Sequence, residues 1–136
     1  MAGLAYLDAS AIVKLIVPEE ESPALLALLG EFDGLVSSAL AAVEVHRVVL
    51  RGLRATPDAA ILQRARQVLA GIHLLRLDQE VLNAAAELRP ETLRTLDALH
   101  LASAMTLEGD LTAFIVYDDR LAAAARQAGL QVLAPR

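Results

Sequence analysis

Short apolar runs alternate with longer Ala- and Leu-rich stretches along the chain, and this alternation restricts the folds that it can adopt. The short runs favour strands, and the longer stretches carry the apolar spacing of helices. Leu4–Leu7 is apolar throughout, as in a strand covered on both faces. Strands that alternate with helices form a parallel sheet with helices on both faces. We therefore expect an α/β protein, a three-layer α/β/α sandwich with a central parallel sheet, folded as one domain over residues 1–136.

Turn and capping residues predict where the elements begin and end. Ser10 is suited to an N-cap, Pro18 stops the helix before it, and Gly129 follows the last helix. The expected strands are Leu4–Leu7, Leu35–Ser37, Ile72–Leu75, Thr112–Tyr117 and Gln131–Leu133. The expected helices are Ser10–Val17, Glu19–Leu29, Ala39–Leu53, a fourth from Pro57 or Asp58 to Leu69, Gln79–Leu88, Leu93–Leu107 and Asp119–Ala128.

Composition excludes several classes of function. The chain has no cysteine, so disulfide scaffolds, thiolate zinc sites and cysteine nucleophiles are excluded. No stretch approaches about 20 unbroken apolar residues, and Met1–Leu7 has no basic residue, so we expect neither a membrane span nor a signal peptide. This predicts a cytoplasmic protein with no membrane partner. A net charge of −5 argues against binding nucleic acid by bulk electrostatics, but not against an enzyme that contacts it locally.

Four acidic residues stand out by their context. Asp8 and Asp118 close the first and fourth expected strands, where the carboxyl ends of a parallel sheet border the ligand crevice. Glu44 and Asp97 lie within apolar helical segments, where a lone carboxylate is unfavourable unless it is paired or binds a cation. Each acid also has an ordinary interpretation: the strand-end residues as caps, Asp97 as a favourable charge at a helix start, and Glu44 as the partner of Arg47. Clustered together, four carboxylates favour Mg²⁺ or Mn²⁺, which prefer oxygen ligands.

Other acid-based α/β enzymes require residues that this chain lacks. A haloacid-dehalogenase-type phosphatase needs a second Asp at the position of Ser10, and a receiver domain needs a Lys after its fifth strand. The only lysine in the sequence, Lys14, lies in the first expected helix. The sequence also has no Gly-rich phosphate loop after the first strand and no Gly-x-Ser-x-Gly nucleophile elbow. These classes are therefore excluded.

The short motifs around the four acids resemble the PIN-domain family, and specifically the VapC-type ribonuclease toxins of prokaryotic toxin–antitoxin pairs. The similarity covers essentially the whole chain, in order and with matching length. Each motif alone is weak evidence, whereas the ordered set is strong. The motifs are Tyr6–Ala11 (Tyr-Leu-Asp-Ala-Ser-Ala), Ser38–Leu40 leading to Val43–Val45, Thr95–Ala102 (Thr-Leu-Asp-Ala-Leu-His-Leu-Ala), Tyr117–Leu121 and Ala128–Leu130.

The resemblance implies an Mg²⁺- or Mn²⁺-dependent endoribonuclease that acts as a toxin, with RNA as substrate, a cognate antitoxin as partner and a homodimeric state. It implies a catalytic quartet formed by Asp8, Glu44, Asp97 and Asp118, of which we expect Asp8 and Asp97 to be the principal metal ligands. The family often has Ser or Thr where this chain has Val116, and Asp119 is an alternative fourth ligand. Two other functions stay open: an RNA-processing PIN nuclease without an antitoxin, and a non-catalytic PIN-like binding module.

Contact with RNA has to come from local groups, because the net charge is negative. We expect Ser10, Arg47 and Arg120 to bind substrate. The two arginines suit this role because a guanidinium makes bidentate contacts with phosphate. Arg47 shares one helix stripe with Arg51 and Arg54, which also fits a solvated helix face.

Two further features concern the surroundings of the site. His100 follows Asp97 on an apolar helix face, which favours a packed histidine over a general base. Ala11–Val17 and Ala24–Leu29 carry more apolar residues than one inward-facing stripe uses, which predicts a surface buried by a protein partner. The resemblance implies that an antitoxin segment binds there and that two copies pair through other helices.

Overall fold

Five strands form one sheet in the order β3-β2-β1-β4-β5, and every pair of neighbours is parallel. The computed structural model describes residues 2–136, so Met1, which opens the N-terminal stretch without basic residues, lies outside the described residues. The strands are β1 (Leu4–Leu7), β2 (Gly34–Ser38), β3 (His73–Leu75), β4 (Leu111–Ile115) and β5 (Val132–Leu133).

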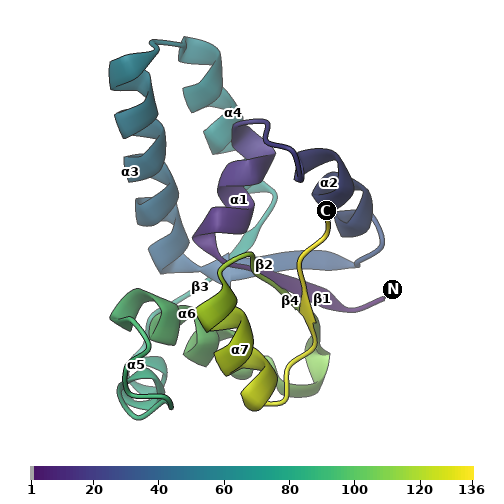
Figure 1. Cartoon of the computed structure of the whole chain (residues 1–136), viewed down its shortest axis with the longest axis vertical. Coiled ribbons are helices and arrows are strands. Elements are labelled where there is room, and N and C mark those ends of the chain that lie inside the picture. Colours follow the sequence, from purple (N-terminus) through teal and green to yellow (C-terminus); the bar gives the residue numbers. More distant parts are fainter. Residues whose placement is uncertain (1) are drawn as a thin grey trace.

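Helices cover both faces of this sheet, as Figure 1 shows with α1 to α4 above it and α5 to α7 below. Successive side chains of a strand point to opposite faces, so Ala5 and Leu7 of β1 join one core while Tyr6 joins the other. The expected three-layer α/β/α sandwich is therefore confirmed. Within residues 2–136, no helix combines the length and the apolar character needed to cross a membrane. The helices are α1 (Ala9–Ile16), α2 (Ser22–Leu29), α3 (Ala39–Ala55), α4 (Ala59–Ala70), α5 (Gln79–Ala86), α6 (Thr95–Met105), the 3₁₀ turn η1 (Glu108–Asp110) and α7 (Asp119–Gln127).

The expected start of the first two helices is wrong. Asp8, not Ser10, caps α1, because its carboxylate accepts a hydrogen bond from the Ala11 N–H. The second helix begins at Ser22 rather than Glu19, because the residues before it are held as a loop. In that loop the Glu19 N–H donates to the Ser22 hydroxyl, and Lys14 pairs with both Glu19 and Glu21.

Other boundaries differ by a few residues at element ends. α6 begins at Thr95, not Leu93, because Arg94 has an extended backbone. β4 ends at Ile115, two residues before the expected end, and its neighbour β5 is only two residues long. The turn η1 was not expected. Gly129 follows α7 with a φ of 90°, which a glycine adopts without strain and which agrees with its expected place after the helix.

The strand order reverses between β1 and β4. From β1 the chain continues to β2 and β3 on one side, whereas β4 and β5 lie on the other side of β1. In an open parallel sheet, ligands bind at the carboxyl ends of the two strands where the order reverses. Asp8 directly follows β1, and Asp118 precedes α7, the helix that follows β4. The topology therefore brings these two acids to the same end of the molecule.

Candidate active site

Asp8 is a buried acid at the end of β1, with 6% of its surface exposed. The Ser10 hydroxyl donates to both of its carboxylate oxygens, at 2.8 and 3.0 Å, and the Ala11 N–H donates to Oδ1 at 3.0 Å. Burial raises the pKa of Asp8 above its ordinary value, although these hydrogen bonds act in the opposite direction, and the charge of Asp97 raises it further. Asp8 thus caps α1, the role that the sequence analysis gave to Ser10, and it is also a buried carboxylate that a cation would stabilise.

Asp97 and Asp118 are linked by Arg94, which the sequence analysis did not single out. Asp97 lies in the first turn of α6, and Asp118 caps α7 by accepting the Leu121 N–H at 2.9 Å. The Arg94 Nε lies 3.0 Å from Asp97 Oδ2, and its Nη2 lies 3.7 Å from Asp118 Oδ2. The i, i+3 spacing of Arg94 and Asp97 was the signal in the sequence that could have revealed this pair.

Glu44 pairs with His100 rather than with Arg47. Its Oε1 lies 2.6 Å from His100 Nε2, and the other ring nitrogen, Nδ1, lies 2.8 Å from the Tyr6 hydroxyl. His100 and Tyr6 are fully buried, at 1% and 0% exposure. The prediction that His100 is packed agrees with this geometry, which connects it directly to an acid of the expected quartet.

The structure brings acids of the expected quartet toward one place. Glu44 and Asp97 line a cleft of about 240 Å³ together with Arg94, and Asp97 is near enough to Asp8 for its charge to act on it. Within residues 2–136, no three His, Asp or Glu side chains form a group that could hold a metal ion as they stand. The donor chemistry nevertheless fits a divalent cation, because all the acids offer carboxylate oxygens and a guanidinium already lies between two of them.

The residues expected to bind substrate occupy different places. Ser10 is exposed and bonded to Asp8. Arg47 lines a cleft on α3 with Arg51 and Arg54, and Arg120 lines another between α7 and the segment before α6. Among the described residues, no ion pair joins Arg47 or Arg120 to the four acids.

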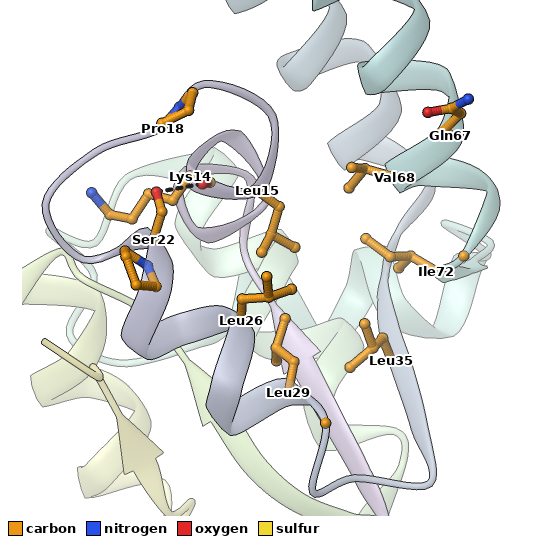
Figure 2. Close-up of a pocket in the computed structure, with 13 residues that line it drawn as sticks. Lys14, Leu15, Pro18, Ser22, Leu26, Leu29, Leu35, Gln67, Val68 and Ile72 are labelled. Atoms are coloured by element: carbon orange, nitrogen blue, oxygen red, sulfur yellow. Dashed lines mark hydrogen bonds between the residues drawn. The ribbon is translucent and has the colours of Figure 1, made fainter.

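A separate apolar groove of about 700 Å³ lies between α1, α2 and α4. Figure 2 shows Leu15, Leu26 and Leu29 on one side of it and Val68 and Ile72 on the other. Leu26 is 67% exposed, which is unusual for a leucine flanked by other apolar side chains. The groove coincides with the helical pair that the sequence predicts to bind a partner.

Comparison with known proteins decides the family. The model of the PIN domain matches residues 5–127. This chain belongs to the PIN-domain family. Ribonuclease VapC46 of Mycobacterium tuberculosis is 48% identical to this PIN domain over 130 residues, which cover 96% of each chain. Ribonuclease VapC47 of the same species is 38% identical over 134 residues, again with 96% of each covered. The expected VapC-type identity is therefore confirmed.

Solved structures agree on the PIN fold. VapC20 of Mycobacterium tuberculosis, described as a Sarcin-Ricin loop cleaving toxin, superposes with a TM-score of 0.71 at 17% identity, covering 96% of this chain and 99% of that one. VapBC2 of Rickettsia felis, bound to a promoter DNA fragment, gives a TM-score of 0.72 at 13% identity, with 98% and 99% covered.

Proposed function

We propose that this VapC-type PIN domain is a metal-dependent endoribonuclease that hydrolyses RNA phosphodiester bonds in the cytoplasm as the toxin of a toxin–antitoxin pair. The observation that supports the chemistry best is the juxtaposition of three acids: Asp97 acts on Asp8 through its charge, and one guanidinium joins Asp97 to Asp118. The relatives that share 48% and 38% of their residues with it are ribonucleases by name, which supports the reaction and the substrate class.

Asp8 and Asp97 would hold Mg²⁺ or Mn²⁺, with Glu44 and Asp118 completing the acidic surface. A divalent cation bound by carboxylates lowers the pKa of a coordinated water and polarises phosphoryl oxygens, which phosphodiester hydrolysis requires. The Ser10 hydroxyl and the Ala11 N–H keep the Asp8 carboxylate in one orientation.

His100 has a similar role toward Glu44. By engaging Oε1, it leaves the other carboxylate oxygen of Glu44 for a water molecule or for the substrate.

The groove between α1, α2 and α4 is the proposed docking site of the antitoxin. Its lining is mostly apolar, and it lies on the two helical segments that carry more apolar residues than one inward-facing stripe uses. One similar solved structure, from Klebsiella pneumoniae, is a toxin–antitoxin complex, with a TM-score of 0.64 at 20% identity. The homodimer stays a prediction, for which Val43 and Leu50 on the exposed side of α3 offer an apolar surface.

Cleavage of RNA by the purified protein tests the proposed reaction. We expect endonucleolytic cleavage in Mg²⁺ or Mn²⁺ that stops in excess EDTA. Asp8→Asn should lower the rate more than about 100-fold, because even residues that merely support metal ligands change activity about 10- to 100-fold. The matched control is Asp78→Asn, since Asp78 caps α5 through the same i+3 N–H contact at 3.0 Å.

The control should cleave like the wild type. Undiminished cleavage in EDTA, or by Asp8→Asn, would refute the proposal. RNA binding without cleavage would instead indicate a non-catalytic PIN-like module.

A further inference from the structure

Arg94 is the positive group closest to the proposed metal ligands. It directly precedes α6, and its guanidinium reaches back to Asp97 and across to Asp118. Asp97 lies in the first turn of α6 and Asp118 caps α7, so Arg94 connects the starts of two different helices. Its side chain is 67% exposed, whereas that of Asp97 is only 13% exposed. The guanidinium therefore covers the acids from the solvent side.

This arrangement gives little stability by itself. Ion pairs that involve an exposed side chain contribute little to folding, because water and salt screen them. Arg94 also makes no side-chain cap for α6, so the helix start does not depend on it. A residue that contributes little to the fold but neutralises two acids of the site has its main effect on the charge of that site.

The chemistry of arginine indicates what Arg94 does once the acids have another counter-ion. A guanidinium stays charged at every physiological pH and offers a planar fork of donors that matches phosphate. Arg94 lines the same cleft as Glu44 and Asp97. Arg47 and Arg120, which the sequence favoured, line other clefts. Arg94 is thus the arginine whose released side chain would meet a phosphate at the acids.

We propose that Arg94 exchanges between two partners: it neutralises Asp97 and Asp118 in the metal-free protein, and a bound divalent cation releases it to hold an RNA phosphate. This inference rests on the proposed ribonuclease function. It makes the metal and the guanidinium competitors for the same carboxylates, and it makes RNA binding through Arg94 conditional on metal.

The first test measures competition by calorimetric titration of Mn²⁺ into the wild type and Arg94→Gln. We expect the variant to bind Mn²⁺ about three- to tenfold more tightly, because a screened positive charge has been removed from beside two carboxylates. The matched control is Arg89→Gln, which removes the same charge from an exposed arginine paired with Glu91. The control should bind Mn²⁺ like the wild type.

The second test measures single-stranded RNA binding in a Glu44→Gln background, which prevents cleavage. In Mg²⁺, Arg94→Gln should reduce the steepness of log K against log salt by about 0.7, the contribution of one phosphate contact on a single strand. In EDTA, Arg94→Gln and Arg89→Gln should give equal slopes, because Arg94 is then held by the acids. Arg94→Lys should keep Mn²⁺ affinity near that of the wild type.

Three results would overturn the inference. If Arg94→Gln weakens Mn²⁺ binding, Arg94 supports the acids instead of competing with metal. If Arg94→Gln and Arg89→Gln agree in both tests, Arg94 is only a surface ion pair. In both cases a wild type that binds Mn²⁺ and cleaves RNA leaves the proposed function intact. A wild type that does neither would refute the proposed function and this inference together.

Discussion

Two buried rings hold Glu44 in place. His100 Nε2 lies 2.6 Å from Glu44 Oε1, so one hydrogen bond joins the ring to the carboxylate. The other ring nitrogen, Nδ1, is hydrogen-bonded to the Tyr6 hydroxyl at 2.8 Å. Burial raises the pKa of Tyr6 far above its ordinary value, so the phenol keeps its proton. Tyr6 and His100 are therefore positioning residues for Glu44.

Replacing Tyr6 by Phe should be destabilising and should also slow RNA cleavage. The change leaves Nδ1 of a buried histidine without its hydrogen-bond partner, which costs about 1–3 kcal/mol of unfolding free energy. Urea unfolding measures this loss. The control is Tyr117→Phe, which removes a hydrogen bond to the Pro135 carbonyl from a partly exposed tyrosine and should cost about 1 kcal/mol or less. Equal losses in stability and activity for both variants would contradict the positioning role.

The raised pKa of Asp8 predicts that the stability of the metal-free protein depends on pH. Burial raises its folded pKa above the unfolded value, so the folded state holds its proton more tightly. The stability from this group is complete below the unfolded pKa and is lost as pH rises through the folded one. In EDTA at pH 7.5, Asp8→Asn should therefore melt a few degrees above the wild type, since Asn caps a helix as well as Asp. The difference should shrink toward pH 4 in thermal melts.

The control and the opposing outcome follow from the same cap geometry. Asp78→Asn changes an exposed cap and should shift the melting temperature little at either pH. A metal-free Asp8→Asn protein that melts below the wild type at pH 7.5 would mean that the ionised carboxylate stabilises the fold, and that burial is not its dominant influence.

At the scale of elements, local patterns predicted the kinds of element and their order, but not every end. Apolar runs and breakers such as Pro18 and Gly129 act within a few residues of themselves, so their effects are visible in the sequence. The start of α2 depends instead on Lys14, a residue of the preceding helix that binds Glu19 and Glu21. Such contacts across a loop leave no periodic signal.

The acids of the site were predictable because each interrupts an apolar segment or ends a strand. The residues that contact these acids could not be predicted in the same way. Tyr6 and His100 are separated by 94 positions, and only the packed sheet brings them together. Arg94 has only its i, i+3 spacing from Asp97 as a signal in the sequence, which is weak because an arginine before a helix has many ordinary uses.

The groove between α1, α2 and α4 leads to a prediction about complex formation. A Leu26→Glu variant should lose co-purification with the antitoxin, because it places a charge in the apolar surface that the partner would bury. Leu82→Glu is the matched control, since Leu82 is an exposed leucine on α5, outside the groove. Co-expression of each variant with a cognate antitoxin measures this. RNA cleavage by purified Leu26→Glu should be unchanged, and retained co-purification would place the partner elsewhere.

At the scale of the whole molecule, topology and charge have separate roles. The reversal of strand order between β1 and β4 brings Asp8 and Asp118 to one end of the sheet, and the apolar groove lies between the helices α1, α2 and α4 of one layer. The net charge of −5 then opposes the approach of RNA from a distance. Attraction has to arise from single groups, from Arg94 beside the acids and from the proposed contacts of Arg47 and Arg120 in other clefts.

This charge balance predicts a weak dependence of RNA binding on salt. Two or three phosphate contacts with a single strand give a slope of about −1.4 to −2.1, so affinity should fall roughly 7- to 20-fold between 50 and 200 mM salt. A basic interface with 6–10 contacts would lose about 10³–10⁵ over the same range. Salt also screens the long-range repulsion from the acidic surface, which reduces the observed slope further.

Titration of single-stranded RNA into the Glu44→Gln protein in Mg²⁺, at four or more salt concentrations, measures this slope. Arg47→Gln and Arg120→Gln should each lower its magnitude by up to about 0.7, according to whether each arginine contacts a phosphate. A fall of 10³ or more would show that RNA contacts many more cations than the three proposed here. The acidic crevice would then be one part of a much larger binding surface, and the assignment of substrate contact to residues near the acids would be wrong.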